Sequence, residues 1–416
     1  MKIALVDNMN NNFFAFARYL RDLGLDVYLY TIPQTSMDHF LPEADTFKDI
    51  KSLSYIKSFP CSMKKGWLFF PKRKIKQEFE SYDFIISSGV SSAFLNKAGL
   101  VSDIIMPYGS DLYDIPFRKF KLSFSIYKMI RGYFKSERSY HQRQAYYKTR
   151  LLSSDDGYEL FFEALKKLNL KSNNFGCPML YNREGINTKE NIQLWSFLGQ
   201  YDFIVFNHAR QHWKSYNVGL KDFEKFGGLK ANNKLIKAFA NFVKVSKYKK
   251  PILILFEYGN DVDESKELIE ILGVKDFVKW MPKMNRRNIL YGLSKANLAT
   301  NAFRENMLDI GGVCFEAISV GVPLINNCQD ANNNQNHKFY NSPMIHALSE
   351  EDIFNIFIDY EINPKKYEEI GKKSKEWFDD HLGIGLAKQY SELIHLMVED
   401  KEVTQNDDRV LKIFKK

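Results

Sequence analysis

The chain has little cysteine, and its cysteines are not arranged as a metal site or a disulfide framework. Its 416 residues include four cysteines. They are widely spaced, at Cys61, Cys177, Cys314 and Cys328. No two of them form a C-x-x-C pair or another metal-ligand spacing. The spacing argues against a disulfide-rich secreted domain and against a cysteine-based metal site, and it fits a reducing cytoplasm best.

Long apolar runs are also absent. The longest runs, such as PILILF at 251–256, are far shorter than the roughly 20 residues that a membrane-spanning helix needs. The N-terminal KIALVD passes directly to polar residues, without the apolar core and cleavage site of a secretion signal. No repeat at a solenoid period is visible, and the only low-complexity tract is the Asn-rich 331–336. We therefore expect a globular protein without a membrane-spanning helix.

Acidic residues are nearly absent from one segment of the first half. Between Arg118 and Arg150, ten lysines and arginines accompany one acid, Glu137, so this segment alone accounts for the chain's net charge of +9. Such a concentration of positive charge suits an anionic partner, although a solvated basic face has the same composition.

A second basic cluster, KKGWLFFPKRKIK, runs from Lys64 to Lys76 and interleaves cations with Trp67, Phe69 and Phe70. Aromatic rings among lysines suit an anionic bilayer surface, where rings lie at headgroup depth. They also suit nucleic acid, although no known nucleic-acid-binding motif accompanies them. A solvated basic face, a membrane surface and a nucleic acid therefore all remain open for the two basic segments.

Strand and helix patterns alternate through the first half. A chain of this length exceeds an average domain of about 150 residues, so two or three domains are expected. An apolar strand at 2–7, an amphipathic helix that ends at Gly24 and a strand at 25–31 form a strand–helix–strand unit. This unit implies parallel pairing with a right-handed crossover. Further strands are expected at 83–89, 103–107 and 150–155.

The same alternation starts again in the second half. The predicted strands are 202–207, 251–256, 277–281 and 297–303, and the predicted helices are 232–247, 264–272 and 286–295. The sequence thus predicts two doubly wound α/β domains, joined near 185–200, that bind ligands at the carboxyl ends of their strands. Segment 363–397 then predicts two helices separated near Gly383. Residues 398–416 are expected to form a frayed or surface-bound tail.

The most informative segment runs from Gly311 to Asn326 and reads GGVCFEAISVGVPLIN. Gly311 and Gly312 open a short helix, Glu316 lies one turn inside it, and a Gly-Val-Pro turn ends it. Glycines at a helix start let backbone N–H groups approach a phosphate, and the helix dipole favours negative charge there. Glu316 can accept hydrogen bonds from a ribose diol beside that phosphate. Ordinary helix caps and turns give the same pattern, so both interpretations stand at this point.

Two such halves, with this Gly-Gly, Glu and Gly-x-Pro helix late in the second, resemble the nucleotide-sugar-dependent glycosyltransferases of the GT-B fold, and family 4 most closely. The resemblance implies two Rossmann-like α/β domains that face each other across a cleft, with C-terminal helices crossing back to the first domain. The expected domains are an acceptor domain at 1–190, a nucleotide-sugar donor domain at 200–370, C-terminal helices at 371–400 and a tail at 401–416.

The family usually carries an arginine after the first strand of its second domain and a Lys-Gly pair that opens the next helix. Arg210 in FIVFNHARQHW and Lys230 in LKANNKLIKAF fill these places, with Ala231 in place of the glycine. The resemblance implies that Arg210 and Lys230 bind the donor diphosphate, where cations stabilise the charge that develops on the leaving group. The gap between them is longer than in the family, so Lys214, Lys221 or Lys225 are candidate substitutes. An exposed cation at a helix start remains the alternative for Lys230.

Two more donor contacts follow from the resemblance. The turn Glu257–Gly259 and the segment Trp280–Pro282 match the family's glycine turn and the loop that lines its base pocket. Gly259 and Met281 are therefore candidate donor-binding residues, Met281 through its backbone. Trp280 fits the hydrophobic core equally well.

The family's signature is a glutamate, seven residues and a second glutamate. Glu316 fills the second place, but the first falls on Leu308, with Asp309 beside it and Glu305 upstream. The resemblance assigns Asp309, Gly311, Gly312 and Glu316 to donor binding. It favours retention of the anomeric configuration over inversion.

In the first half, PYGSDLYDIP resembles the family's His-Gly-x-Asp turn, with Tyr108 in place of the histidine and with Gly109 and Asp111 kept. Tyr108 and Asp111 are therefore the candidate catalytic residues. Asp111 would act as general base in an inverting enzyme and would position the sugar in a retaining one. A purely structural turn remains the alternative. The loop Asn8–Asn12 replaces the family's glycine-rich loop, and asparagine tolerates the positive φ that such a loop needs.

The function implied by the resemblance is transfer of a sugar from a nucleotide-diphosphate sugar, UDP-sugar before others, to an acceptor hydroxyl in bacterial surface glycan synthesis. The enzyme class generally needs no metal or other cofactor, and His208 and His212, spaced i, i+4, have no carboxylate beside them in the sequence. We expect a cytoplasmic enzyme without a nucleic-acid partner, docked through its basic segments on the inner membrane face. A nucleotide-sugar 2-epimerase of similar fold and a non-catalytic polyanion-binding protein are the alternatives.

Overall fold

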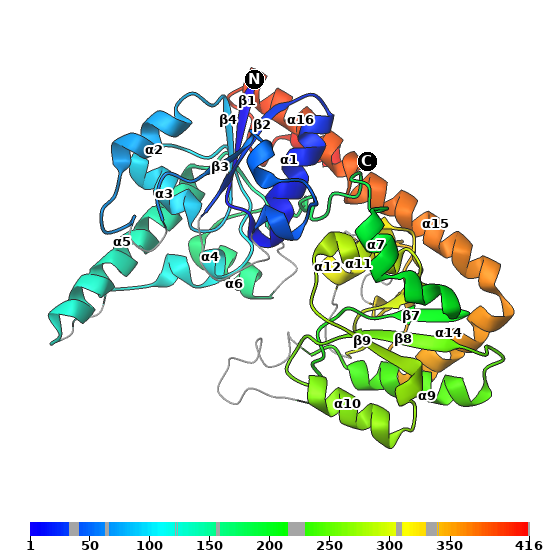
Figure 1. The fold of residues 1–416 in the computed structure, drawn as a ribbon. Coiled ribbons are helices and arrows are strands. Elements are labelled where there is room, and N and C mark those ends of the chain that lie inside the picture. The colour runs from blue at the N-terminus through cyan, green and yellow to red at the C-terminus, as the bar shows by residue number, and fades with distance from the viewer. Residues whose placement is uncertain are drawn as a thin grey trace. The chain divides into compact units, whose positions relative to one another are not determined.

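The computed structural model describes residues 1–32, 41–62, 66–120, 122, 124–154, 159–214, 229–304, 310–329, 339 and 341–414. It divides into two compact units (Figure 1). Unit 1 comprises Met1–Tyr181 and His381–Lys416, and unit 2 comprises Asn182–Asp380.

Unit 1 is built on a six-stranded sheet of order β3-β2-β1-β4-β5-β6 in which every neighbouring pair is parallel. Its strands are almost continuous apolar runs because helices cover both faces. The strands are β1 (Lys2–Val6), β2 (Asp26–Thr31), β3 (Ile56–Ser58), β4 (Phe84–Ser87), β5 (Ile104–Ile105) and β6 (Leu151–Leu152). Its helices are α1 (Asn12–Asp22), α2 (Lys72–Phe79), α3 (Ser91–Ala98), α4 (Ser110–Tyr113), α5 (Ile126–Lys148), α6 (Glu159–Leu168), α16 (Ile384–Glu399) and α17 (Asp408–Phe414).

The alternation of side chains along β1 divides the core of unit 1 into two layers. Ile3 and Leu5 pack with α1 and α16 on one face. Ala4 and Val6 point to the opposite face and pack with α2 and α3. Trp67 belongs to this second layer, with only 2% of its surface exposed and its ring 4.8 Å from that of Phe94. The predicted surface role of Trp67 in the cluster 64–76 is therefore wrong, because the indole fills the core.

Unit 2 repeats the architecture with a six-stranded parallel sheet of order β12-β11-β10-β7-β8-β9. Its strands are β7 (Phe203–Phe206), β8 (Pro251–Phe256), β9 (Val278–Met281), β10 (Leu298–Thr300), β11 (Leu324–Asn326) and β12 (Ile345–His346). Its helices are α7 (Lys189–Leu194), α9 (Asn232–Val245), α10 (Val262–Ile271), α11 (Arg286–Leu293), α12 (Gly312–Ser319), α14 (Glu350–Ile362) and α15 (Pro364–His381), whose last residue falls in unit 1.

The two faces of this second sheet are also covered. Phe203 and Val205 of β7 share a core with α9, α10 and α14. Phe206, on the other face, lies 5.5 Å from the ring of Trp195, in the segment that follows α7. The two Rossmann-like sheets confirm the predicted fold class.

The C-terminal helices return to unit 1, as expected. Tyr390 of α16 packs against Phe16 at 4.9 Å, and Phe414 of α17 stacks on Phe175 at 3.9 Å. The expectation of a frayed or surface-bound tail is wrong for the described part of 398–416. Three of its apolar residues, Val403, Val410 and Ile413, are buried in the layer formed by α1 and α16. Among the described residues, no helix is long and apolar enough to cross a membrane.

Candidate functional site

The carboxyl edge of the second sheet carries a row of buried asparagines. Asn207 follows β7, Asn301 follows β10, and Asn326 ends β11. The Asn207 amide donates to Thr300 Oγ1 at 2.8 Å, and the Asn301 amide donates to Asn326 Oδ1 at 3.1 Å. Because parallel strands end at the same edge, these amides join three strands where doubly wound sheets bind ligands.

Glu316 of α12 lies beside this edge and is held at both carboxylate oxygens. His208 Nε2 lies 2.6 Å from Glu316 Oε2, and Arg286 Nε donates to Oε1 at 2.7 Å. Burial alone would raise the pKa of this carboxyl, but the Arg286 charge and the His208 hydrogen bond outweigh burial and leave the pKa below its ordinary value. Glu316 is thus a fixed carboxylate. Each oxygen keeps a second lone pair that can accept a hydrogen bond from a hydroxyl group.

His208 and Arg286 were not assigned to this role from the sequence. His208 follows β7, and Arg286 opens α11 directly after the N-cap residue Asn285. The other ring nitrogen of His208, Nδ1, is buried and has no hydrogen-bond partner among the described residues. A buried polar atom of this kind normally has a partner, which in many proteins is a water or a ligand.

The glycines that open α12 leave space at its N-terminus. Gly311 is the N-cap residue, with φ −152°, and a Cβ at Gly311 or Gly312 would meet no heavy atom within 4 Å. Neither position needs glycine for its φ, so the absence of side chains keeps the N–H groups of the first turn accessible. The approach of a phosphate to these groups remains a prediction.

Lys230 and Arg210 differ in their surroundings. Lys230 is buried, and its backbone joins two loops: its N–H donates to His212 O at 2.7 Å, and its carbonyl accepts from Phe303 N at 3.0 Å. Arg210 is exposed and makes no ion pair with another described residue. The structure therefore brings the Lys230 backbone to the segment that carries Arg210, and diphosphate binding by the two cations remains a prediction.

Ala231 adopts φ +54° and ψ +39° at the N-cap of α9. This left-handed conformation is the one in which glycine is favoured. This conformation is a physical reason for the glycine in the Lys-Gly pair of the resembling family. In this chain an alanine adopts it at a cost in backbone strain.

Of the candidate substitute lysines and the remaining residues of the glutamate signature, only Lys214 lies within the described residues. Lys214 donates its backbone N–H to Asp261 Oδ2 at 2.6 Å. Asp309, Lys221 and Lys225 lie outside the described residues, as do Glu305 and Leu308.

Gly259 has a structural reason to be glycine. Its φ is +117°, and a Cβ would overlap the backbone of Gln211. Gln211 and the loop after β8 are also joined by hydrogen bonds from Gln211 N to Tyr258 O at 2.7 Å and from Asp261 N to Gln211 O at 3.1 Å. Gly259 therefore positions the loop that carries His208 and Arg210.

Met281 ends β9 and is buried, with 5% of its surface exposed. Its carbonyl accepts from Glu257 N at 2.9 Å. The backbone contact that the resemblance assigns to Met281 would have to use the second lone pair of this oxygen.

Unit 1 brings Asp111 and Tyr108 together with Asp7, which the sequence did not indicate. Asp111 Oδ1 accepts from the backbone N–H groups of Gly109 at 2.8 Å and of Tyr108 at 3.2 Å. The Tyr108 hydroxyl donates to Asp7 Oδ2 at 3.4 Å. Asp111 Oδ2 is buried and has no hydrogen-bond partner among the described residues. The cluster lies at the carboxyl ends of β1 and β5, the usual place for a ligand.

Burial is the main cause of the raised pKa values in this cluster. It raises the pKa of Asp7 to about 7, with a smaller contribution from the nearby Asp111. It also raises the pKa of Asp111 to about 6, against the opposing backbone hydrogen bonds. Two buried carboxyls of this kind titrate as a pair near neutral pH and can give and take a proton.

Gly89 lies against both Asp7 and Tyr108 in this cluster. At its φ of +59°, a Cβ would overlap Asp7 Oδ2 and lie 2.7 Å from the Tyr108 hydroxyl. Only glycine therefore lets the Asp7 carboxyl meet Tyr108.

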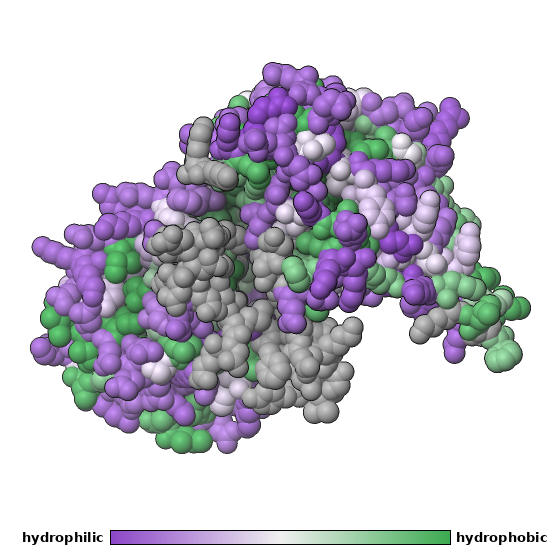
Figure 2. All heavy atoms as spheres, turned by 180° about the vertical axis from the view of Figure 1, so that it is seen from behind, coloured by the Kyte–Doolittle hydropathy of each residue, from purple (hydrophilic) through white to green (hydrophobic). Residues whose placement is uncertain are grey.

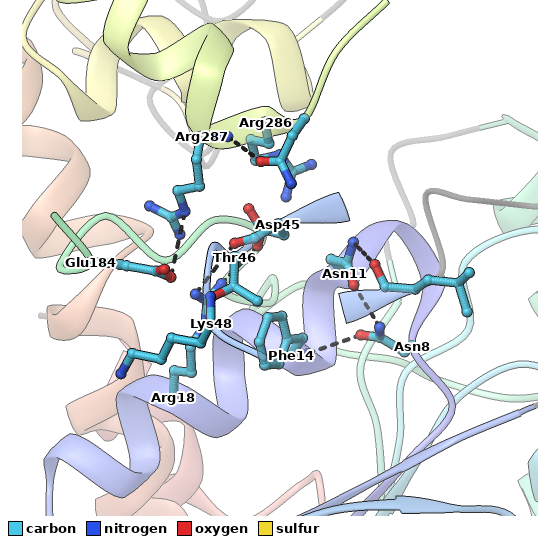
Figure 3. Close-up of polar contacts among 12 residues, drawn as sticks. Asn8, Asn11, Phe14, Arg18, Asp45, Thr46, Lys48, Glu184, Arg286 and Arg287 are labelled. Atoms are coloured by element: carbon cyan, nitrogen blue, oxygen red, sulfur yellow. Dashed lines mark hydrogen bonds and ion pairs between the residues drawn. The ribbon is translucent and has the colours of Figure 1, made fainter. Parts of the chain in front are cut away.

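The asparagine loop that follows Asp7 is ordered by its own side chains (Figure 3). The Asn8 amide donates to Asn11 Oδ1 at 2.7 Å, and Asn8 Oδ1 accepts from Phe14 N at 2.9 Å. Asn10 and Asn11 adopt φ of +51° and +60°, so the expected tolerance of positive φ is used. Asn8 N donates to Asp7 Oδ1 at 2.7 Å, so the loop fixes the Asp7 carboxyl.

The histidine pair does not have the geometry of a helical metal site. His208 and His212 lie in the segment after β7, outside any helix, and His208 bonds to Glu316. Within the part of the chain that the structure describes, no three His, Cys, Asp or Glu side chains are grouped as a metal-ion site requires.

No protein-family model matches the chain, and no curated protein sequence matches it. Several solved structures are similar over nearly their full length. HepE of Anabaena in complex with UDP and glucose is 14% identical, with 95% of this chain and 99% of that chain covered and a TM-score of 0.55. A glycosyltransferase from Rickettsia africae is 13% identical, with 98% and 99% covered and a TM-score of 0.56. A UDP-GlcNAc 2-epimerase from Neisseria meningitidis bound to UDP-GlcNAc is 12% identical, with 96% and 100% covered and a TM-score of 0.56. These structures are of the GT-B type, so the fold of this chain is GT-B.

Proposed function

We propose that the chain is a nucleotide-sugar-dependent glycosyltransferase that binds its donor, a UDP-sugar, at the carboxyl edge of the second sheet. The observation that carries the proposal is the buried Glu316 carboxylate, held by His208 and Arg286 beside the glycine-opened start of α12. A fixed carboxylate beside free helix N–H groups offers an acceptor for the ribose diol and donors for the diphosphate within one element. The solved complexes with UDP and with UDP-GlcNAc on the same fold support the choice of base.

The reaction breaks the bond between the sugar C1 and the diphosphate oxygen and forms a bond from C1 to an acceptor oxygen. Negative charge develops on the departing diphosphate. Arg210, Lys230 and the α12 N-terminus would stabilise that charge, as preorganised cations and N–H groups do in phosphate-releasing enzymes. No metal is needed in this scheme, so activity should persist in the presence of a chelator.

Unit 1 would supply the group that handles the acceptor proton. In an inverting reaction Asp111 accepts the hydroxyl proton, with Tyr108 and Asp7 keeping the carboxyl pair in a state that can take it. In a retaining reaction, which the family resemblance favours, the leaving diphosphate takes the proton and Asp111 positions the sugar. The anomeric configuration of the product distinguishes the two.

A thermal-shift series with UDP, GDP, ADP and CMP tests the donor proposal. A ligand that binds the folded chain adds RT ln(1 + [L]/Kd) to its free energy of unfolding and therefore raises its melting temperature. The expected result is a rise with UDP above the others, and loss of that rise in Glu316→Gln. Equal responses to all four nucleotides, or an unchanged UDP response in the variant, would contradict the proposal.

A nucleotide-sugar 2-epimerase is the second candidate, favoured by one observation. An epimerase must remove and return a proton on the sugar, and the buried Asp7 and Asp111 carboxyls with raised pKa suit proton exchange. The epimerase similarity on the same fold adds support. Incubation with UDP-GlcNAc alone separates the two: an epimerised sugar indicates the epimerase, whereas sugar transfer requires an added acceptor.

The acceptor and the location belong to the proposal too. We infer an acceptor in bacterial surface glycan synthesis, such as a lipopolysaccharide, capsule or lipid-linked oligosaccharide precursor, and a cytoplasmic enzyme on the inner membrane face. The free state of all four cysteines supports a reducing compartment. A non-catalytic polyanion-binding protein, by contrast, would bind nucleic acid with a steep salt dependence and would show no response to UDP.

A further inference from the structure

Helix α5 of unit 1 is packed at one end only. It runs for 23 residues, from Ile126 to Lys148, and all of its buried residues, such as Ser139 and Tyr146, lie in the C-terminal half. The first 13 positions of the helix contain no fully buried residue, and among them Phe134 is partly buried against the core layer of α2 and α3. In Figure 1 this N-terminal half extends away from the sheet of unit 1.

The packed half is fixed to the core by hydrogen bonds. Glu137 accepts from Trp67 Nε1 at 3.0 Å and pairs with Lys97 at 2.9 Å. Ser139 donates to Pro116 O at 2.6 Å. The projecting half is therefore a continuation of an anchored helix, and its direction relative to unit 1 is set by these contacts.

The projecting end displays apolar side chains. Ile126, Ile130 and Tyr133, at i, i+4 and i+7, share one side of the helix and are 71%, 51% and 58% exposed. Leu122 and Phe124, just before the helix, are almost fully exposed, and Tyr127 is 70% exposed. We call these six residues the α5 tip. Figure 2 shows hydrophobic residues gathered at this projecting end.

Single exposed apolar residues are ordinary, but a contiguous group on a projecting element marks an interaction surface. The charges around the α5 tip identify the partner. Lys128, Arg131 and Lys135 of the same half-helix are exposed and form no ion pair with another described residue. No acidic residue occurs from residue 118 to residue 136.

We propose that the α5 tip docks unit 1 on an anionic membrane surface. Leu122, Phe124 and Ile126 enter the boundary between headgroups and acyl chains, and Lys128, Arg131 and Lys135 contact the lipid phosphates. Apolar side chains and unpaired cations on one projecting helix are the two components of reversible membrane binding.

Other partners fit the surface less well. A second copy would bring the same unpaired cations against one another, which opposes association through this face. A single-stranded nucleic acid could stack bases on Phe124, Tyr127 and Tyr133. It would leave the exposed aliphatic side chains of Leu122, Ile126 and Ile130 without an apolar partner. Lipid is the partner that uses both the aliphatic side chains and the cations.

The same helix reaches the carboxyl cluster of unit 1. Gln142 Nε2 donates to Gly89 O at 3.1 Å, and the Tyr146 hydroxyl donates to Asp111 O at 2.9 Å. Docking of the α5 tip would therefore fix the distance between the lipid surface and Asp111, which suits an acceptor attached to a lipid. This link rests on the proposed function, whereas the docking itself holds whether or not the chain transfers a sugar.

Vesicle sedimentation of the full chain tests the docking. The probes are vesicles of phosphatidylcholine mixed with phosphatidylglycerol and vesicles of phosphatidylcholine alone. The wild type is expected to bind the anionic vesicles and to prefer them over the neutral ones. The triple variant Phe124→Ser/Ile126→Ser/Ile130→Ser should lose at least about tenfold in partition coefficient, because it removes the buried apolar area. Lys128→Gln/Arg131→Gln/Lys135→Gln should lose the preference for anionic vesicles.

A control variant replaces three other apolar residues that are more than half exposed, in unit 2: Val245→Ser/Ile271→Ser/Ile362→Ser. Their exposed fractions are 61%, 73% and 65%. This control should bind vesicles as the wild type does, and all variants should keep the wild-type melting temperature because the changed residues lie at the surface.

Three outcomes overturn the proposal. The first is that the wild type does not bind anionic vesicles. The second is that the α5 tip variant and the control lose vesicle binding equally. The third is that the wild type forms dimers, and that the α5 tip variant is monomeric but binds vesicles as the wild type does. Failure of the UDP thermal shift leaves the vesicle result untouched, so the two proposals fail separately.

Discussion

The Nε2 atom of His208 and the Oε2 atom of Glu316 lie 2.6 Å apart, although 108 residues separate them in the chain. The pair joins the segment after β7 to α12, and Arg286 completes it from α11. Three elements thus converge on one carboxylate. The charge of Glu316 therefore stabilises the local structure, in addition to any contact that it makes with a ligand.

Glu316→Gln tests this dual role. Removing the charge weakens the contacts of Glu316 with Arg286 and with the buried His208, so we expect the free energy of unfolding to fall by about 1–3 kcal/mol. Chemical denaturation of the full chain measures the change. Glu369→Gln, at an exposed position of α15, is the control and should leave stability within about 0.5 kcal/mol. Equal stability of the two variants would mean that the ion pair contributes nothing.

Arg210→Ala separates ligand binding from folding. Arg210 is exposed and has no ion-pair partner among the described residues, so the substitution should leave the melting temperature unchanged. If Arg210 binds the diphosphate, the affinity for UDP should fall by about tenfold or more, the effect of losing a charged hydrogen bond of about 1.5–3 kcal/mol. Calorimetric titration with UDP measures this. Arg73→Ala, an exposed arginine of unit 1, should bind UDP normally.

The buried Asp7 predicts a dependence of stability on pH. Burial raises its pKa from 3.8 to about 7, so the folded chain keeps a proton that the unfolded chain has already lost between these pH values. The contribution of Asp7 to stability is therefore full below about pH 4 and declines as the pH rises to about 7. At about 1.4 kcal/mol for each pKa unit, the total decline is about 4 kcal/mol at most.

Asp7→Asn replaces the carboxyl with a neutral amide and should remove most of this decline. Urea unfolding of both proteins on the two sides of the window measures it. A variant that loses stability with rising pH as steeply as the wild type would assign the effect to another group.

Gly89→Ala is expected to destabilise unit 1 more than Gly99→Ala. Both glycines have positive φ, +59° and +86°, so both variants carry the cost of a left-handed residue, about 1 kcal/mol. Only at Gly89 would the added Cβ also overlap Asp7 Oδ2, whereas at Gly99 it would meet nothing within 4 Å. We expect the Gly89 variant to lose at least about 1 kcal/mol more, measured by thermal unfolding. Similar losses would show that the Asp7 carboxyl moves aside without cost.

Ala231→Gly should stabilise the chain. The left-handed φ of +54° at Ala231 costs an L-residue about 1 kcal/mol, which glycine avoids. Ala240→Gly, inside the same helix α9, is the opposite control and should lower stability by about 1 kcal/mol or more, because glycine weakens a helix interior. Comparison of melting temperatures checks both signs.

The parts of the fold that depend on local patterns could be predicted. Continuous apolar runs such as 251–256 mark strands of parallel sheets buried on both faces, and the glycines around Glu316 mark the helix α12 between two turns. The tail could not be predicted, because its scattered apolar residues have the pattern of a surface segment. Val403, Val410 and Ile413 are buried only because the layer of α1 and α16 packs against them.

The partners of the site residues were also beyond the sequence. Arg286 reaches Glu316 from 30 positions upstream, and Asp7 reaches Tyr108 over 101 positions. Such pairs depend on how strands are ordered in a sheet, which no local pattern encodes. The available signal for Asp7 was its place at the carboxyl end of the first strand, an edge at which polar residues gather in doubly wound sheets.

The return of α16 and α17 to unit 1 has a consequence for biosynthesis. The first strands of unit 1 leave the ribosome early, but Tyr390 and Phe414, which complete the layer over Phe16 and Phe175, are made last. Unit 2, whose residues are contiguous from Asn182 to Asp380, can close its core first. One apolar face of the nascent N-terminal sheet therefore stays uncovered until α16 and α17 have been made. A stop codon that removes α17 would leave unit 2 complete and unit 1 incomplete.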